Sequence, residues 1–237
     1  MIDQNKLKQY LAEWDLAYSD EVLQNLDRFA ELLLERNQSV NLTAIKEPDA
    51  VLVKHILDSL LVFKCVSFPE SAKVIDVGCG AGFPSMPMLI ARNDLKMHFL
   101  DSTQKKLCFI EDALAALQLS GTVIHTRAEE YGKKNVSRET FDFAVARAVA
   151  NLSSLCELTL PLVKPGGYFV AMKGKEGEEE LEQAKAAIKT LGGKTQALHT
   201  FALPDGSGRT IIVIKKISQT PTKYPRNAAA ILKKPLS

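Results

Sequence analysis

The sequence has little of the chemistry that builds metal sites or disulfides. It contains four cysteines and four histidines in 237 residues, and no two cysteines are spaced as CxxC. The histidines share no ligand spacing with the cysteines, so a zinc site is not expected. The scattered cysteines also give no disulfide framework. We therefore expect a chain that needs neither a metal nor a disulfide.

Long apolar runs are missing as well. Each later apolar run is interrupted by charge, as in ILDSLLVF, and the opening MIDQNKLKQYLAEW has an acid at its third position. We therefore expect neither a membrane span nor an export signal, and a cytoplasmic protein. The length suits one folded unit with an appendage.

Two phosphate-binding glycine motifs are incomplete in the stretch KVIDVGCGAGFPS, residues 73–85. The dinucleotide fingerprint requires GxGxxG, but the spacing here is GxGxG, and Phe83 stands at the required final glycine. No lysine followed by serine or threonine lies at P-loop spacing. These gaps disfavour a nicotinamide oxidoreductase and a nucleoside triphosphate site.

The sequence does contain a regular alternation of secondary-structure patterns. Residues 1–70 have apolar positions three and four apart, which predicts two or three helices. Later runs predict strands at 73–77, 96–101, 121–126, 141–146 and 167–172, then a helix near 178–191 and a hairpin of 194–203 with 208–217. We expect an α/β fold with a seven-stranded, mostly parallel sheet and a closing antiparallel strand.

The predicted organisation has three parts within one folded unit. An N-terminal helical extension covers 1–70, the sheet domain covers 71–217, and a basic tail covers 218–237. Residues 1–70 carry 7 basic and 12 acidic groups, whereas residues 209–237 carry 7 basic and no acidic group. Such an end is either a polyanion contact or a solvated surface tail.

The glycine turn has the form D-x-G-x-G-x-G, with Asp76 before Gly78, Gly80 and Gly82. It looks like the motif by which Rossmann-like methyltransferases hold S-adenosylmethionine, where the backbone approaches the methionine part and a carboxylate can face its ammonium group. Asp101 ends the next strand, and an acid there can take both ribose hydroxyls. The alternative is a tight turn beside a surface acid.

Three further residues follow the next strands. Ala128 and Glu129 would reach the adenine side, and Arg147 follows the fourth strand. The Asn-Pro-Pro-Tyr and Pro-Cys strings of exocyclic-amine and cytosine-carbon methyltransferases do not occur. Nitrogen 7 of guanine has a lone pair and no proton to remove, so its methylation needs alignment more than a base. Arg147 would orient the base or the cofactor, or it simply closes the sheet through a salt bridge.

Seven strings in order resemble the bacterial ribosomal RNA small subunit methyltransferase G family, also called glucose-inhibited division protein B. They are NLTAI, HILDSL, DVGCGAGFP, RAEEYG, ARAVANL, LPLVKPGG and the terminal YPR with KKPL, and they cover nearly the whole chain. The resemblance implies a class I S-adenosylmethionine-dependent fold and an activity of the 16S rRNA (guanine(527)-N(7))-methyltransferase type, by direct in-line transfer. It also implies a monomer acting on 16S rRNA in the small subunit or an assembly intermediate.

The resemblance also implies roles for individual residues. Those expected to contact the cofactor are Gly78, Phe83, Ala128, Glu129 and Arg147. Those expected to shape the catalytic mouth are Asn41, His55, Asp58, Arg147 and Lys173, with Arg226 and the basic tail touching RNA. Without the resemblance, His55 on an apolar helix is more typical of a hydrogen-bonded structural histidine than of a catalytic one, and Asn41 is typical of a turn cap.

The chain departs from the family pattern in three places. Cys79 stands where serine is usual, Ser85 where glycine is common, and NAAAIL at 227–232 replaces a lysine-, glycine-, threonine- and proline-containing stretch. The last change puts the tail's RNA contact in question. Two other functions remain open at this stage. One is a non-catalytic RNA-binding or assembly module, and the other is a small-molecule or protein methyltransferase.

Overall fold

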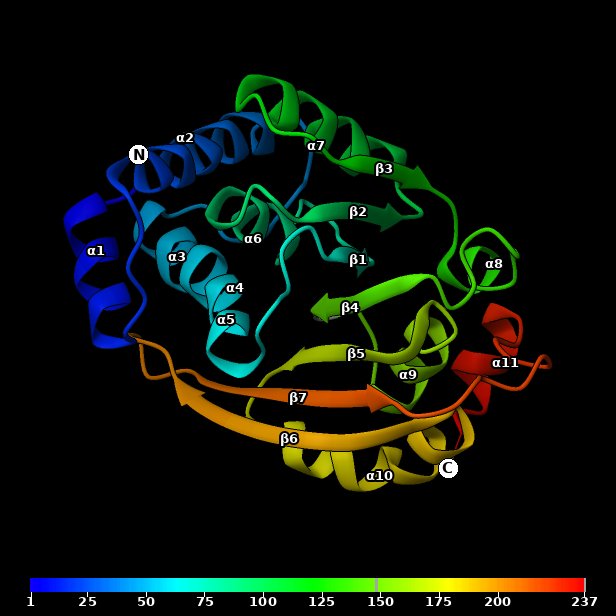
Figure 1. Cartoon of the computed structure of the whole chain (residues 1–237). Coiled ribbons are helices and arrows are strands. Elements are labelled where there is room, and N and C mark those ends of the chain that lie inside the picture. Colours follow the sequence, from blue (N-terminus) through cyan, green and yellow to red (C-terminus); the bar gives the residue numbers. More distant parts are fainter. Residues whose placement is uncertain (148, 237) are drawn as a thin grey trace.

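The computed structural model describes residues 1–147 and 149–236, and its centre is a seven-stranded sheet (Figure 1). The strands are β1 (Lys73–Val77), β2 (Lys96–Asp101), β3 (Thr122–His125), β4 (Phe141–Arg147), β5 (Val163–Lys173), β6 (Gly193–Ala202) and β7 (Gly208–Lys216). Their order is β3-β2-β1-β4-β5-β7-β6. Strands β1 to β5 are parallel, and β7 runs antiparallel to both β5 and β6. The predicted sheet is confirmed.

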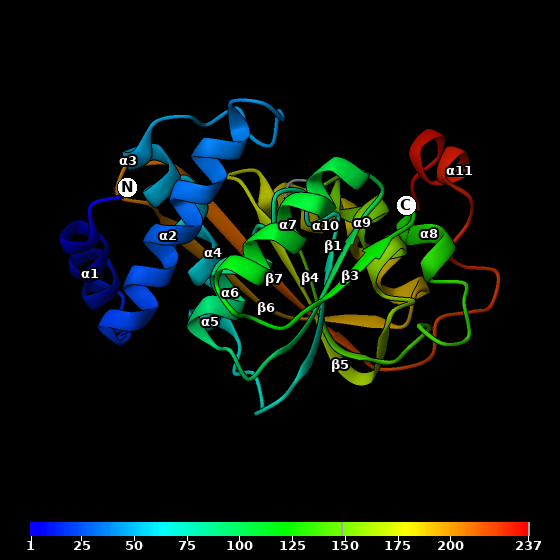
Figure 2. The ribbon, with the colours of Figure 1, turned by 90° about the horizontal axis from the view of Figure 1, so that it is seen from above.

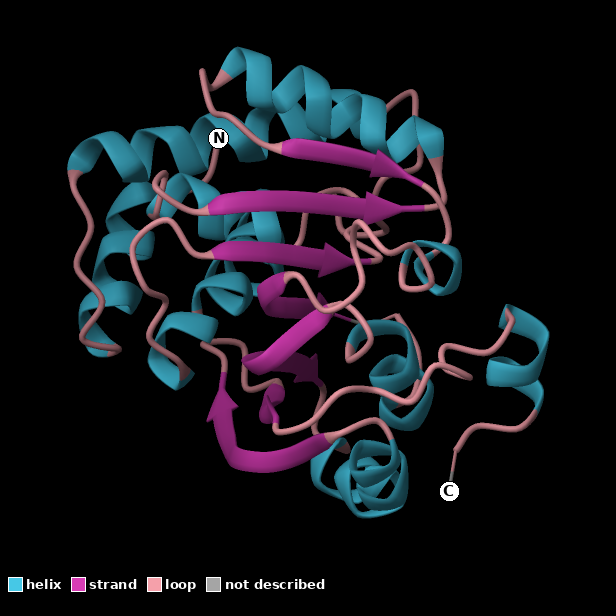
Figure 3. Ribbon diagram, turned by 45° about the vertical axis from the view of Figure 1, so that its right-hand side comes forward, coloured by secondary structure: helices cyan, strands magenta, loops and turns pink. Residues whose placement is uncertain are grey.

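Helices cover both faces of this twisted sheet (Figure 3). Outside the stretch from Pro48 to Cys65, they are α1 (Gln4–Glu13), α2 (Asp20–Asn37), α6 (Ser85–Ala91), α7 (Gln104–Ala116), α8 (Ala128–Tyr131), α9 (Leu152–Thr159), α10 (Gly177–Thr190) and α11 (Ala228–Lys233). Side chains of Asp3, Ser19, Asn151 and Asn227 accept backbone hydrogen bonds at the starts of α1, α2, α9 and α11. These residue types are the preferred helix N-caps.

The helical stretch from Pro48 to Cys65 is broken into four pieces. It consists of α3 (Pro48–Val51), the π-helix η1 (Leu52–Leu57), α4 (Asp58–Leu60) and α5 (Val62–Cys65). The expectation of two or three N-terminal helices is therefore too low. Apolar spacing of three and four does not distinguish an α turn from a π turn, because both keep one face of the helix apolar.

Two hydrophobic clusters lie on opposite sides of the sheet. One joins α1 and α2 to α6 and α7 through fully buried side chains such as Leu26, Phe29 and Ile110. The other joins α9 and α10 to the sheet through Leu155 and Ile188. Burying each such side chain contributes about 2 kcal/mol. The N-terminal helices thus share one core with the sheet. Figure 2 shows from above how α2 lies beside α6 and α7.

The sheet has a switch point at β1, which lies between β2 and β4. The chain leaves β1 toward β2 and β3 on one side, and returns to β4 and β5 on the other. The carboxyl ends of β1, β2 and β4 therefore open a crevice at one edge, where folds of this kind bind ligands. Within the described residues no helix has the length and apolarity needed to cross a membrane.

Candidate active site

Two pockets lie at the carboxyl edge of the sheet. The first, here the glycine-turn pocket, has a volume of about 320 Å³. It is lined by Val77, Gly78, Gly80, Leu100, Asp101, Ser102, Lys106, Thr126, Arg127, Ala128, Glu129, Val149 and Leu158. Five of the residues predicted to hold the cofactor are among them: Gly78, Gly80, Asp101, Ala128 and Glu129. The remaining four are not among the lining residues: Asp76, Gly82, Phe83 and Arg147.

The glycine turn keeps backbone open to the glycine-turn pocket. Gly78 and Gly80 have φ of 75° and 56°, the left-handed region that favours glycine. The Gly78 N–H donates to the Leu100 carbonyl at 2.8 Å, which fixes the turn to the end of β2. A Cβ at Gly80 would have only the Lys106 ammonium nearby, at 4.0 Å, so glycine here leaves space that a ligand can use.

Asp101 is held ready to accept hydrogen bonds. One carboxylate oxygen accepts from the Gly80 N–H at 2.9 Å and the other from the Thr103 N–H at 2.8 Å. The residue is 9% exposed. A carboxylate has about four acceptor sites, so two remain for a ligand. The arrangement suits a pair of neighbouring hydroxyl groups, as in a ribose.

Asp76 and Gly82, at the two ends of the glycine turn, line neither pocket. The Ser85 hydroxyl and N–H both donate to Asp76 Oδ2, at 2.5 Å and 3.2 Å, and this contact fastens the start of α6. Burial raises the pKa of Asp76 to about 7. A Cβ at Gly82 would lie 2.5 Å from Met86 Cγ. The structure places the Asp76 carboxylate away from the pocket surface, and the serine that departs from the family pattern is its partner.

The second pocket, here the arginine pocket, has a volume of about 450 Å³. It is lined by Ile45, Lys54, His55, Asp58, Arg147, Met172, Lys173, Gly174, Glu180 and Arg209. The predicted mouth residues His55, Asp58, Arg147 and Lys173 are thus brought together. Asn41 is exposed and is not among the lining residues.

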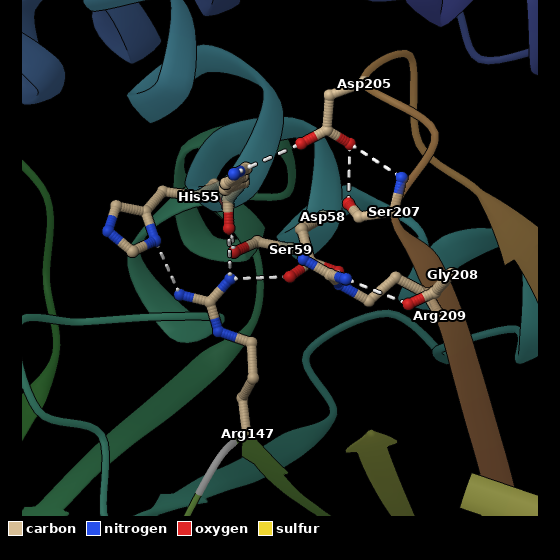
Figure 4. A network of polar contacts seen from close by, with 9 residues as sticks. His55, Asp58, Ser59, Arg147, Asp205, Ser207, Gly208 and Arg209 are labelled. Atoms are coloured by element: carbon tan, nitrogen blue, oxygen red, sulfur yellow. Dashed lines mark hydrogen bonds and ion pairs between the residues drawn. The ribbon is translucent and has the colours of Figure 1, made fainter. Parts of the chain in front are cut away.

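Arg147 is fixed by three hydrogen bonds, which Figure 4 shows, and by an aromatic ring. Its Nη1 donates to Asp58 Oδ2 and to the Lys54 carbonyl, both at 3.0 Å, and its Nη2 donates to His55 Nδ1 at 3.0 Å. The guanidinium carbon lies 5.1 Å from the centre of the Phe83 ring. Phe83 is therefore the platform beneath the arginine, and burial lowers the pKa of Arg147 from its ordinary value.

Asp58 links two arginines that come from different strands. Its second oxygen accepts from Arg209 Nε at 3.0 Å, while Arg147 occupies the first. Asp58 is 3% exposed, so its charge depends on these partners. Arg209 is the second residue of β7 and was not identified from the sequence. No local motif marks it, because 151 positions separate it from Asp58.

His55 is neutral and its ring is fixed. Burial and the nearby Arg147 charge lower the pKa of His55 to about 3. Because arginine only donates, His55 Nδ1 must accept from Arg147, and the ring proton lies on Nε2. That Nε2–H donates to Thr43 Oγ1 at 2.8 Å, and the ring stacks on Phe83 at 4.3 Å. A general base needs a free lone pair, but the Nδ1 lone pair of His55 already accepts from Arg147.

The NLTAI loop is shaped by Asn37 rather than by Asn41. Asn37 Oδ1 accepts from the N–H groups of Leu42 and Thr43 at 2.8 Å and 3.0 Å, and its Nδ2 donates to the Thr43 carbonyl at 3.0 Å. These bonds bring the Thr43 hydroxyl to His55. Asn37 could have been identified from the sequence, because it ends a helical pattern, and asparagine at such a position hydrogen-bonds to nearby backbone.

Lys173 closes the far side of the arginine pocket. Its ammonium donates to the Ala150 carbonyl at 2.6 Å and pairs with Glu180 at 2.8 Å. The same Glu180 oxygen accepts from the Leu152 N–H at 2.8 Å. Lys173 therefore ties the end of β5 to the start of α9, and it is only 8% exposed.

The lining of the arginine pocket has more positive than negative charge. Lys54, Arg147, Lys173 and Arg209 face two carboxylates, Asp58 and Glu180. A third carboxylate, Asp205, pairs with Lys54 at 3.3 Å. One positive charge remains in excess, which suits a ligand that carries a phosphate. In the described part of the chain, no group of three or more His, Cys, Asp and Glu side chains could hold a metal ion.

Arg226 lies outside both pockets. Its guanidinium pairs with the buried carboxylate of Glu157 on α9, at 2.6 Å. Of the seven basic residues from 209 onward, Arg209, Lys216 and Arg226 are each ion-paired within the fold. The charge available to an RNA from this end is therefore smaller than the sequence count predicts, and the predicted RNA contact of Arg226 competes with its bond to Glu157.

The chain matches known proteins over nearly its whole length. Residues 22–209 match the family model of the rRNA small subunit methyltransferase G. The chain is 44% identical over 237 residues to a ribosomal RNA small subunit methyltransferase G from Geobacillus, which covers 99% of this chain and 100% of that one. It is also 44% identical over 228 residues to the protein of that description from Bacillus subtilis, covering 95% of each chain.

Solved structures with low sequence identity share the fold. A SAM-dependent O-methyltransferase from Thermotoga maritima has a TM-score of 0.53 at 14% identity, covering 79% of this chain and 72% of that one. A precorrin-6y C5,15-methyltransferase from Geobacter metallireducens has a TM-score of 0.51 at 14% identity, covering 67% of this chain and 87% of that one. At this identity the likeness shows the class I methyltransferase fold alone.

Proposed function

Because the chain belongs to the rRNA small subunit methyltransferase G family, we propose that it methylates nitrogen 7 of one guanine in 16S rRNA by direct in-line transfer. S-adenosylmethionine is the cofactor, and rRNA is the class of substrate. The proposal adds which atom receives the methyl group, nitrogen 7 of guanine, and how it is transferred, directly and in line. We infer that the substrate is the small subunit or an assembly intermediate of it.

The observation that carries the proposal is the adjacency of two different pockets. Asp76 of β1 lies opposite Val145 of β4. Gly78 and Arg147 are each two residues further on, so both lie at the carboxyl ends of these neighbouring strands. Gly78 lines the glycine-turn pocket and Arg147 lines the arginine pocket. A methyl donor held in the first pocket would thus face a nucleotide held in the second.

The residues of the glycine-turn pocket fit S-adenosylmethionine. Gly78 and Gly80 line the pocket, and the open space beside Gly80 would let the methionine part approach the backbone. Asp101 keeps acceptor sites for two ribose hydroxyls. Ala128 and Glu129 would contact the adenine side. When bound, the cofactor supplies a methyl group on a positively charged sulfur, a group that a ring nitrogen can take without a covalent enzyme intermediate.

The residues of the arginine pocket fit a guanine that only needs to be aligned. Arg147 has five N–H donors, and its contacts with Lys54, His55 and Asp58 use three of them. The other two can donate to the O6 edge of guanine, which leaves nitrogen 7 free. His55 is neutral with both ring nitrogens engaged, so it serves to hold Arg147 and removes no proton. A reaction without proton removal matches this arrangement.

The experiment that tests the proposal is transfer of labelled methyl from S-adenosylmethionine to small ribosomal subunits from cells that lack the corresponding gene. Nucleoside analysis should find the label in 7-methylguanosine of 16S rRNA. Label in another nucleoside would refute the ring nitrogen, and cofactor binding without transfer would favour a non-catalytic module or another substrate. Subunits should be better substrates than short naked RNA of the same sequence, because A-form helices hide the guanine edge in a deep groove.

A further inference from the structure

The C-terminal segment of residues 218–236, here the strap, is fastened to the fold by buried polar contacts. Lys216, two residues before it, is fully buried and pairs with Glu139 at 3.0 Å while donating to Thr220 Oγ1 at 2.6 Å. The Arg138 guanidinium donates to the Thr220 carbonyl at 2.7 Å and to the Tyr224 carbonyl at 2.8 Å. These contacts hold the first half of the strap against the fold.

The strongest contact of the strap is between Arg226 and Glu157. Glu157 is 0% exposed, so its charge has to be matched within the protein. Glu157 Oε1 accepts from the Arg226 backbone N–H at 2.8 Å and from Nε at 2.9 Å, and Oε2 accepts from Nη2 at 2.6 Å. Such a two-pronged pair fixes both distance and orientation. It sets where the strap crosses α9.

The strap supports one wall of the glycine-turn pocket. A Cβ at Gly132, which ends α8, would lie 3.3 Å from Pro225 Cγ, and Arg138 Nη1 donates to the Gly132 carbonyl at 3.1 Å. Helix α8 begins with Ala128 and Glu129, which line the pocket. On the other side, Glu157 directly precedes the lining residue Leu158. Tyr224 belongs to the hydrophobic cluster against which Ala128 and Leu158 pack.

We propose that Arg226 is a positioning residue for the cofactor, acting through Glu157 and Pro225 on the wall formed by α8 and Leu158. The strap then sets the affinity for S-adenosylmethionine, whereas Arg226 contributes little to the affinity for RNA. The proposal rests on the function proposed above for the glycine-turn pocket. The strap lysines Lys233 and Lys234 belong to none of the ion pairs among the described residues and supply a control. Lys223 is not used for it, because its ammonium lies 5.3 Å from the centre of the Tyr224 ring.

The test measures the dissociation constant of S-adenosylmethionine by calorimetry on the full chain, without RNA. Arg226→Gln should weaken binding about tenfold, the size typical of coupling between two sites, and Arg226→Lys should recover part of it. The control variant with Lys233→Gln and Lys234→Gln should bind as the wild type does. In methyl-transfer assays, Arg226→Gln should raise KM for the cofactor and leave kcat and the KM for subunits unchanged.

A second variant keeps every charge. Gly132→Ala should also weaken cofactor binding, because its Cβ would lie 3.3 Å from Pro225 Cγ, closer than most such contacts, and so would push the strap and α8 apart by a few tenths of an ångström. Unchanged cofactor affinity in Arg226→Gln, with weaker RNA binding, would overturn the proposal and assign Arg226 to the RNA. Unchanged affinity in a folded Gly132→Ala would overturn it too. If the wild type binds S-adenosylmethionine but methylates no RNA, the proposed function fails while this comparison of cofactor affinities still decides the role of Arg226.

Discussion

Replacing His55 should change how the stability of the protein depends on pH. The pKa of His55 is about 3 in the fold and about 6.5 in an unfolded chain, because burial and Arg147 oppose its protonation. Its contribution to stability is therefore fully present above pH 6.5 and is lost as the pH falls toward 3. The slope is about 1.4 kcal/mol per pH unit well below pH 6.5 and half of that at pH 6.5, so the loss between pH 6.5 and 4.5 is about 2 kcal/mol.

Asp76 acts in the opposite direction. Burial raises its pKa to about 7 from an ordinary value of 3.8, so the folded state holds a proton that the unfolded chain has lost. Its contribution is present below pH 3.8 and is lost as the pH rises through 7. Between about pH 4 and 6.5 the slopes from His55 and Asp76 cancel. Together these two groups should give the wild type no net slope in that range.

The variant His55→Asn isolates the first of these slopes. The Asn carbonyl can still accept from Arg147, but the side chain does not titrate, and the stack on Phe83 is lost. At neutral pH the variant should be less stable than the wild type by about 1 to 3 kcal/mol. As the pH falls from 6.5 to 4.5 the stability of the wild type relative to the variant should fall by about 2 kcal/mol.

The assay is urea unfolding, followed through the single tryptophan, Trp14, at several pH values between 4.5 and 7.5. Thr43→Val is the control. It removes the partner of His55 Nε2 but keeps the imidazole, so it should lower stability by a nearly constant amount at every pH. A difference between wild type and His55→Asn that does not vary with pH would refute the reasoning.

Two further predictions concern the carboxylates of the two pockets. Asp58→Asn leaves Arg147 and Arg209 facing each other without the negative charge between them. The variant should lose about 3 kcal/mol of unfolding free energy in urea titrations and have a lower kcat. An equally stable and active variant would contradict the bridging role. Asp101→Ala removes the acceptor for the Gly80 N–H and for the ligand hydroxyls. Its calorimetric affinity for S-adenosylmethionine should fall about tenfold or more, and a change below twofold would exclude the predicted ribose contact.

The strands could be predicted from the sequence because each buried parallel strand is a short apolar run ended by a turn. The one clear difference lies in β5, which begins at Val163 rather than at 167. Its register against β4 jumps from Val163 opposite Phe141 to Tyr168 opposite Phe143. The KPGG residues between them bulge out of the pairing, so they read as a turn in the sequence although they lie within a strand.

The site could be predicted only in part, for a reason of geometry. Gly78, Gly80 and Asp101 follow their strands directly, so local motifs are enough to identify them. Arg209 enters the arginine pocket from β7, and its role depends on a contact with Asp58 that no local pattern contains. The sequence also overcounts the free positive charge of the C-terminal end, because a count of residues cannot tell which lysines and arginines are paired inside the fold.

The π-helix η1 makes the number of residues between Leu52 and Leu57 part of the site. A π turn holds one residue more than an α turn, and deleting one residue would let the helix close normally. The residues after the deletion would then stay in phase, with Asp58 still opposite Arg147. The Lys54 carbonyl and the His55 ring lie inside the wide turn, so they are the contacts of Arg147 that depend on the extra residue. A one-residue deletion within this segment should therefore loosen the hold on Arg147 while the sheet and Asp58 keep their places.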